Sequence, residues 1–262
     1  MILALKKRAH ALLSRLARRL LGRLHPGQNL FVLDGDGLEA FRATGVYQGV
    51  FTTHHVGHLH QGEFERAFEA AYVETPAAVD RETLRYRTYT ASSLARQASA
   101  LEGGFLCIGV AWGVLARTVM NCAWFAGSGK AMWLVDAWEG VFAYGEEARR
   151  SLDIYPDSVE PVQGLFSGYP KARLIQGRAP EVLDRVAAER FCFIHLDIAD
   201  PVIEPDIIRA AVPLMTPGGV LVVDNYGLRG GRPDAFDAVF RELGLTPLVL
   251  LNGQAVVFIP RD

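Results

Sequence analysis

Apolar runs alternate with helix-like segments through the second half of the chain. The runs are FLCIGV (105–110), AMWLVD (131–136), ARLIQ (172–176), FCFIHLD (191–197) and GVLVVDN (219–225). They are apolar on both faces, which is typical of strands covered by helices on each side. The segments with helical patterns are 113–126, 139–150, 157–166, 178–190, 203–214 and 233–243. This alternation predicts an α/β fold with a mostly parallel sheet.

The end of the chain has a different pattern. Two further apolar runs, TPLVLL and AVVFIP, are separated by NGQ, and Asn252-Gly253 is a strong tight-hairpin signal. We therefore expect the last strand to run antiparallel to its neighbour. A dinucleotide-binding dehydrogenase would normally continue with parallel crossovers, so the hairpin argues against an NAD-dependent oxidoreductase, which stays the weakest alternative.

The N-terminal part is organised differently from the sheet region. Residues 1–25 are expected to form a basic amphipathic helix, because apolar residues at spacings of three and four make one stripe: Ile2, Leu5, Ala9, Leu12, Leu16 and Leu20. Residues 26–103 read as an irregular cap with two or three helices, placed over the carboxyl edge of the sheet. Residues 104–262 are expected to form the catalytic domain.

Charge is concentrated in this first helix. Residues 1–24 carry seven basic side chains and no acidic ones. The rest of the chain has 20 basic and 29 acidic residues, so its net charge is −9. Such a helix can pack on its own domain or on a second subunit of a homo-oligomer, lie on an anionic membrane surface, or be a cleaved targeting segment. The net charge of −2 gives no reason to expect nucleic acid as a partner.

The cysteines and the lengths of the apolar runs indicate the cellular compartment of the chain. Cys107, Cys122 and Cys192 sit in apolar runs with no pairing pattern, which indicates buried thiols in a reducing compartment such as the cytoplasm. No apolar run approaches the ~18–20 residues that span a bilayer.

Candidate ligand-binding residues follow the expected strands. Ligands of open α/β sheets bind beyond the carboxyl ends of the strands. Gly109 and Gly113 follow the first strand, where glycine lets a backbone approach a ligand closely. Asp136 ends the second strand, where a carboxylate can accept from both hydroxyls of a ribose. The glycine pair alone is equally compatible with a structural turn.

A second group of polar residues ends two later strands. Asp197 ends FIHLD, and Asp224 and Asn225 end GVLVVDN. Two carboxylates and an amide oxygen with room for water suit Mg²⁺, which prefers hard oxygen ligands. An Asp-Asn turn cap beside an isolated acid is the alternative interpretation.

These motifs resemble those of known methyltransferases over about residues 84–260. The reversed hairpin is similar to that of class I S-adenosylmethionine-dependent methyltransferases, DAWEG (136–140) resembles the D-S-F-E-G of the macrolide-sugar O-methyltransferase family, and the Asp-Asp-Asn set resembles the metal ligands of catechol O-methyltransferase. The resemblance implies a Rossmann-like methyltransferase fold with a seven-stranded sheet. It also implies S-adenosylmethionine bound by Cys107, Gly109, Gly113, Asp136, Trp138, Gly177, Arg178, Ala179 and Asp197. Cys107 stands where many of these enzymes carry a carboxylate.

The same resemblance implies a reaction. Mg²⁺ on Asp197, Asp224 and Asn225 would orient a hydroxyl of a sugar, a glycan or another polyhydroxylated small molecule. Asp197 and Asp200 are the expected catalytic residues, although Asp200 can equally be a further metal ligand or a helix cap. His195 is interpreted as a core histidine. A catalytically silent binding protein with the same fold is the main alternative, favoured by Cys107 and by the unusual segment DIADPVIEPDI.

Three other motifs are weaker. FVLDGDG (31–37) looks like the start of an aspartate-nucleophile phosphatase but lacks the residues expected next. The histidines of TTHHVGHLHQ could bind a transition metal, although a polar loop bordering the substrate cleft is the simpler interpretation: His54, His55, His58 and His60. Arg85 and Arg87 are expected either on a solvated helix face or against the cofactor's carboxylate.

Overall fold

A computed structural model describes residues 57–75, 81–142, 149–150, 155–198, 200, 202–226 and 233–261, together with four short strands between 31 and 52. The chain divides into two compact units, 1–58 and 59–262. In the first unit, β1 (Phe31–Val32) pairs antiparallel with β2 (Ala40–Phe41), and β3 (Gly45–Tyr47) with β4 (Val50–Thr52). A 3₁₀ turn, η1, covers Gly57–Leu59. The basic segment 1–25 lies outside the described residues.

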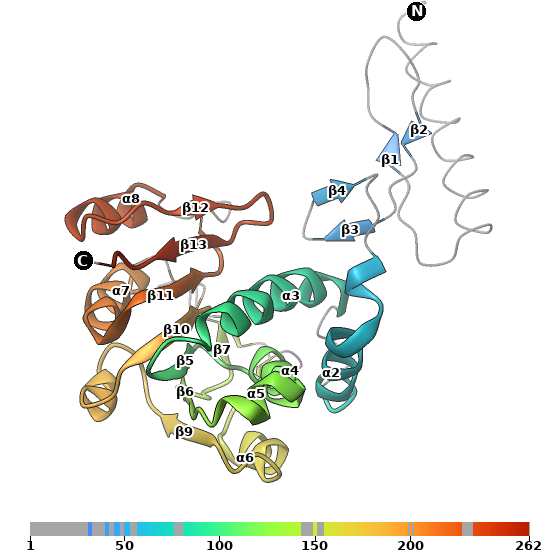
Figure 1. The fold of residues 1–262 in the computed structure, drawn as a ribbon, viewed down its shortest axis with the longest axis horizontal. Helices are drawn as coiled ribbons and strands as arrows, with labels where there is room; N and C mark the ends of the chain where they lie inside the picture. The colour runs from blue at the N-terminus through green and yellow to red at the C-terminus, as the bar shows by residue number, and fades with distance from the viewer. Residues whose placement is uncertain are drawn as a thin grey trace, which may run out of the picture. The chain divides into compact units, whose positions relative to one another are not determined.

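The second unit is built on a seven-stranded sheet in the order β12-β13-β11-β10-β5-β6-β9 (Figure 1). Five strands are parallel: β5 (Gly104–Ile108), β6 (Met132–Asp136), β9 (Ala172–Gln176), β10 (Phe191–Leu196) and β11 (Met215–Val223). The last two, β12 (Leu248–Val249) and β13 (Ala255–Phe258), form the hairpin expected at Asn252-Gly253, and β13 runs antiparallel to β11. The predicted Rossmann-like sheet with a reversed terminal hairpin is confirmed.

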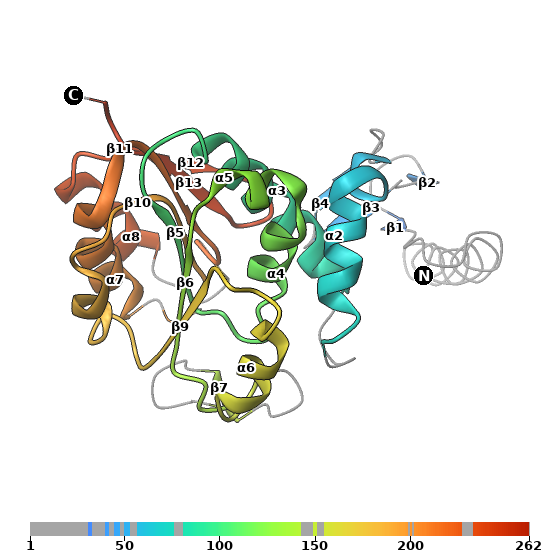
Figure 2. The ribbon, with the colours of Figure 1, turned by 60° about the horizontal axis from the view of Figure 1, so that its bottom comes forward.

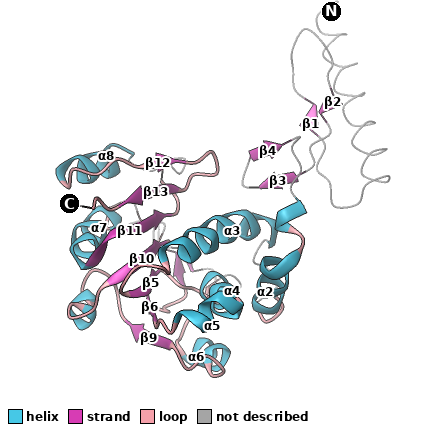
Figure 3. Cartoon of the chain, in the orientation of Figure 1, coloured by secondary structure: helices cyan, strands magenta, loops and turns pink. Residues whose placement is uncertain are grey.

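Helices cover both faces of this sheet (Figures 2 and 3). On one face, buried residues of four helices share a core with the strands: α3 (Arg81–Ala98), α4 (Val114–Asn121), α5 (Ala123–Ser128) and α6 (Glu160–Phe166). Helix α2 (Gly62–Tyr72) packs outside them, against α4. Among the described residues, no helix is both long enough and apolar enough to cross a membrane.

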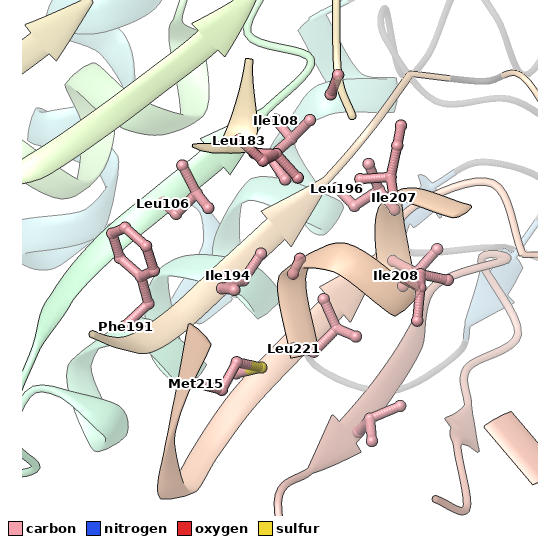
Figure 4. Packing of buried hydrophobic residues seen from close by; sticks show 14 of the residues in the cluster. Leu106, Ile108, Leu183, Phe191, Ile194, Leu196, Ile207, Ile208, Met215 and Leu221 are labelled. Carbon is pink, nitrogen blue, oxygen red and sulfur yellow. The ribbon is translucent and has the colours of Figure 1, made fainter. Parts of the chain in front are cut away.

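The opposite face has its own core. The turn η3 (Leu183–Val186) and the helices α7 (Glu204–Ala211) and α8 (Pro233–Glu242) pack there, with η4 (Val212–Leu214) leading into β11. In Figure 4, Ile194 and Leu196 of β10 have the β5 residues Leu106 and Ile108 on one side and the α7 residues Ile207 and Ile208 on the other. Because successive strand residues point to opposite faces, residues 193 and 195 of β10 face α3, as does Asp197 just beyond the end of this strand.

Two segments differ from their prediction. Residues 139–150 were expected to be helical, but β7 (Val141–Phe142) and β8 (Arg149–Arg150) form an antiparallel pair. Residues 178–190 form turns and the short η3 instead of a helix. Pro180 removes a backbone donor near the start of that segment, which disfavours a continuous helix there.

Candidate functional site at the carboxyl edge of the sheet

The polar residues expected at strand ends lie along one edge of the sheet. Backbone hydrogen bonds join neighbouring ends in series: Gly177 N to Asp136 O (2.9 Å), Gly109 N to Val135 O (2.9 Å), Asp197 N to Ile108 O (2.8 Å) and Asp224 N to Leu196 O (2.8 Å). The structure therefore brings the glycine turn, Asp136 and the acidic residues together at the edge where α/β proteins bind ligands.

The glycine turn is fixed by close contact with the next strand end. Gly109 has φ of +81°, and a Cβ placed there would lie 2.0 Å from the carbonyl oxygen of Asp197. At Gly113, φ is +74° and a Cβ would lie 2.5 Å from the ring of Phe166. Both positions therefore require glycine for internal packing, whether or not a ligand approaches.

Asp136 joins the end of β6 to this turn. Its Oδ2 accepts from the amides of Val110 (2.6 Å) and Ala111 (2.8 Å), and its Oδ1 accepts from the amide of Trp138 (2.8 Å). The Trp138 indole, 2% exposed, donates to the carbonyl of Ala111 (3.0 Å). Ala111 and Trp138 both have positive φ, which is uncommon for residues with side chains and occurs more often at functional sites.

The turn after β9 carries the three residues expected beside an adenine. Gly177 has φ of +147°, and Ala179 is buried. Arg178 is exposed and forms an ion pair with Glu139, which is also exposed and follows Asp136 closely in the chain. The predicted contacts of these residues with a cofactor stay predictions.

Cys107 lies in the interior of β5 and faces α3. It is 3% exposed within the apolar core, and burial raises its pKa to about 12. The thiol is therefore protonated and packed. Its predicted contact with the cofactor stays a prediction.

Arg87 of α3 lies among the three residues predicted to hold a metal. Its Nε is 3.2 Å from Asp224 Oδ2, its Nη1 is 3.6 Å from Asp197 Oδ2, and its Nη2 donates to Asn225 Oδ1 at 3.1 Å. Asn225 in turn donates through Nδ2 to Asp197 Oδ1 at 2.5 Å. The structure thus confirms that the three residues are neighbours, and it adds a cation that the sequence pattern did not indicate.

Two further side chains contact Asp224. His195 Nε2 lies 3.3 Å from its Oδ2, and Gln254 Nε2 donates to its Oδ1 at 2.7 Å. Burial alone would raise the pKa of Asp224, but the charges of Arg87 and His195 and hydrogen bonds from His195 and Gln254 outweigh burial and lower that pKa to about 2. Burial raises the pKa of Asp197, which Arg87 only partly offsets.

These contacts decide whether the set fits Mg²⁺. Each oxygen that would coordinate the ion already faces a protein donor: Asp197 Oδ2 is paired with Arg87 at 3.6 Å, and the other oxygens accept from Arg87, Asn225 or Gln254. The set as folded does not fit Mg²⁺, and the predicted metal stays untested.

Asp200 and Glu204 hold the segment that follows Asp197. Asp200 Oδ1 accepts from the amide of Val202, two residues further on (2.9 Å), as in an Asx turn. Glu204, 1% exposed, accepts from the amide of Ile198 (3.1 Å). The predicted helix-cap role of Asp200 is wrong, because Ile203 is the N-cap residue of α7 and no side chain caps it. The predicted roles of Asp200 as a base or a metal ligand stay predictions.

The arginines differ from the expected solvated helix face. Arg85 is buried and bound to Glu65, Glu69 and the carbonyl of Leu59. Sequence analysis also missed Gln254, which looked like part of the Asn252-Gly253 turn. For Arg85 and Arg87, the sequence did carry one signal of burial: two arginines spaced two residues apart on a helix that otherwise presents small residues to the core.

The remaining motifs lie largely elsewhere. Residues 33–37 of FVLDGDG, and His54 and His55, fall outside the described residues. His58 and His60 are described at η1 and just after it. Their metal-binding role stays a prediction.

Comparison with known proteins agrees with this architecture. No protein-family model matches the chain. A Mycobacterium avium protein described as an O-methyltransferase is 34% identical over 129 residues, which are 43% of this chain and 58% of that protein. A Mycobacterium tuberculosis protein described in the same way is 33% identical over 129 residues, with 43% and 57% covered. The chain thus spans less than two thirds of the length of these relatives.

Solved structures share the fold at low sequence identity. The O-methyltransferase NovP aligns with a TM-score of 0.58 at 16% identity, covering 76% of this chain and 97% of that one. CalS11, a calicheamicin methyltransferase, aligns with a TM-score of 0.53 at 14% identity, covering 86% and 98%. The Podospora anserina methyltransferase PaMTH1, bound to SAH, aligns with a TM-score of 0.52 at 16% identity, covering 77% and 89%. The class of fold is therefore that of the O-methyltransferases.

Proposed function

We propose that this chain is an S-adenosylmethionine-dependent O-methyltransferase that acts on a hydroxyl of a sugar, a glycan or another polyhydroxylated small molecule. The observation that carries the proposal is the joint position of the glycine turn, Asp136 and Asp197 at one sheet edge. The O-methyltransferase relatives and the structures similar in fold, one of which was solved with SAH, support it.

The cofactor side can accept an adenosyl ligand. A carboxylate has about four lone-pair positions, and Asp136 uses three of them for backbone amides. The remaining position on Oδ1 can accept from a ribose hydroxyl. Exposed polar side chains, Gln176 and Glu139, border the same turns. S-adenosylmethionine, when bound, supplies a methyl group on a positively charged sulfur.

The acceptor side is proposed at Asp197. Its side chain is 29% exposed, against 2% for Asp224, so Asp197 is the more accessible carboxylate of the pair. It can accept a hydrogen bond from an acceptor hydroxyl and orient that oxygen. Asp200 is proposed as the group that removes the hydroxyl proton. We do not include magnesium, because Arg87 already contacts the residues that would hold it.

Two observations bear on the alternatives. The packed, protonated thiol of Cys107 favours the catalytically silent binding protein as the second candidate. The antiparallel β12–β13 hairpin disfavours an NAD-dependent oxidoreductase. We also infer that the chain works in a reducing compartment such as the cytoplasm, since all three cysteines are free and buried. Membrane contact and subunit pairing through residues 1–24 stay predictions.

The deciding experiment is calorimetric titration of S-adenosylmethionine into the purified chain, with Mg²⁺ and with a chelator. Micromolar binding supports the methyltransferase and directs the search for hydroxylated acceptors. Absence of binding in both conditions, from a protein that unfolds cooperatively, supports the silent binding protein.

A further inference from the structure

The guanidinium of Arg87 contacts all three residues of the predicted metal set, one through each of its nitrogens. Nε contacts Asp224, Nη1 contacts Asp197 and Nη2 contacts Asn225. Arginine presents its donors as a rigid planar fork that stays charged at any physiological pH. Its three nitrogens thus supply the positive charge that the two carboxylates require.

We propose that Arg87 takes the place of a divalent cation in this site, so that the chain positions its acceptor without metal. This inference rests on the proposed methyltransferase function, because it concerns the acceptor side of that site. Arg87 is a positioning residue here: it fixes Asp197 and Asn225, which face the acceptor.

The orientation of Asn225 supports this assignment. Its amide oxygen accepts from Arg87 and its amide nitrogen donates to Asp197 Oδ1. A bound divalent ion would need the amide oxygen and a carboxylate oxygen of Asp197 free of these donors. Asn225 holds φ of +64°, a conformation that asparagine tolerates better than most residues, so its side chain is aimed by a defined backbone turn.

The surrounding contacts hold Arg87 in this position. Two residues earlier on α3, Arg85 is buried and paired with Glu65 and Glu69, which fixes the helix against α2. Gln254 donates both to the carbonyl of Arg87 (3.3 Å) and to Asp224. An entering metal ion would have to displace the guanidinium of Arg87, whose side chain is 12% exposed, and leave that charge unpaired, which is costly for a largely buried group.

The net charge of the site also disfavours binding of a divalent ion. With Arg87 in place, the two carboxylates keep a net charge near −1 instead of −2, which lowers their attraction for a divalent ion. A tethered cation also competes at a high effective concentration that a free ion must exceed.

Manganese binding tests this proposal independently of catalysis. The full chain is titrated with Mn²⁺ and free ion is followed by electron paramagnetic resonance, alongside Arg87→Ala, Arg87→Lys and the control Arg96→Ala, an exposed arginine of the same helix. We expect no specific binding by the wild type, Arg87→Lys or Arg96→Ala, and one equivalent bound by Arg87→Ala.

One result overturns the proposal: one equivalent of Mn²⁺ bound by the wild type and lost in Asp197→Asn. The wild-type titration decides this even if Arg87→Ala does not fold. Titration of S-adenosylmethionine in the presence of a chelator is carried out separately. A chain that binds neither ligand contradicts the methyltransferase function, and one that binds the cofactor together with Mn²⁺ contradicts only the role of Arg87.

Discussion

Arg87 Nε lies 3.2 Å from Asp224 Oδ2, and this ion pair joins helix α3 to the residue that directly follows strand β11. The two residues are far apart in the sequence, and both are almost excluded from solvent. Removing one partner of such a pair leaves the other charge buried without compensation, at a cost of about 3–5 kcal/mol. The pair therefore serves stability as well as the site.

The low pKa of Asp224 predicts acid-dependent stability. Because its pKa falls from an ordinary ~4 in the unfolded chain to about 2 in the folded one, the stabilisation is complete above about pH 4 and is lost as pH falls towards 2. We expect Asp224→Asn to be less stable than wild type at pH 7, by roughly 2 kcal/mol or more, and the difference to shrink below pH 4. Urea unfolding followed by circular dichroism across this pH range measures it. A difference independent of pH would contradict the ionised pair.

Gly109 is expected to be intolerant of a side chain. Gly109→Ala combines a positive φ with a Cβ 2.0 Å from the Asp197 carbonyl oxygen. Gly244→Ala is the matched control, since φ there is +67° but no atom lies within 4 Å of the added Cβ. We expect about 1 kcal/mol of destabilisation for the control and several times that for Gly109→Ala. If the two variants lost the same stability in thermal unfolding, the ends of β5 and β10 would have moved apart to accommodate the added methyl group at little cost.

Asp136 is expected to order the cofactor turn. In Asp136→Asn one oxygen is replaced by an NH₂ group that cannot accept from the backbone amides, so at least one charge-assisted hydrogen bond, worth about 1.5–3 kcal/mol, is lost. We expect lower stability and at least tenfold weaker binding of S-adenosylmethionine by calorimetry. Glu139→Gln, which removes only an exposed ion pair with Arg178, serves as the control and should change stability by less than about 1 kcal/mol. Unchanged affinity of Asp136→Asn for S-adenosylmethionine would show that the Asp136 carboxylate does not contribute to cofactor binding.

The buried thiols are expected to be unreactive in the folded chain. Burial raises the pKa of Cys107 to about 12 and also raises the pKa values of Cys122 and Cys192. Since the thiolate is the reactive form, Ellman's reagent at pH 8 should label the native protein slowly and label all three cysteines once guanidinium chloride is added. Rapid labelling of Cys107 in the native state, identified by peptide mass, would instead place its thiol at an accessible ligand site.

Much of the fold follows from local sequence patterns, and the site does so only in part. Apolar runs such as FCFIHLD and the Asn252-Gly253 turn are local signals, and they predicted the strands, the hairpin and the residues at the strand ends. The contacts of Arg87 with Asp224, Asn225 and Gln254 are set by tertiary packing between residues more than a hundred positions apart, which sequence periodicity does not indicate. The prediction of a helix at 139–150 was wrong at both of its described ends, where Val141–Phe142 pairs with Arg149–Arg150, because strand pairing joins positions that a helical period does not relate.

Asp200 provides the sharpest test of catalysis, because its hydrogen bond to the Val202 amide and its proposed proton transfer can be separated. Asn and Asp both form such Asx turns, so Asp200→Asn should keep the hydrogen bond to the Val202 amide and the melting temperature of the wild type. It cannot accept a proton, so turnover should fall at least about a hundredfold while the affinity for S-adenosylmethionine is unchanged. Asp200→Ala, which removes both roles, should lose turnover and stability together. Full turnover in Asp200→Asn, measured with any acceptor that the wild type methylates, would limit Asp200 to its hydrogen bond with Val202. Asp197 would then be the carboxylate that accepts the proton.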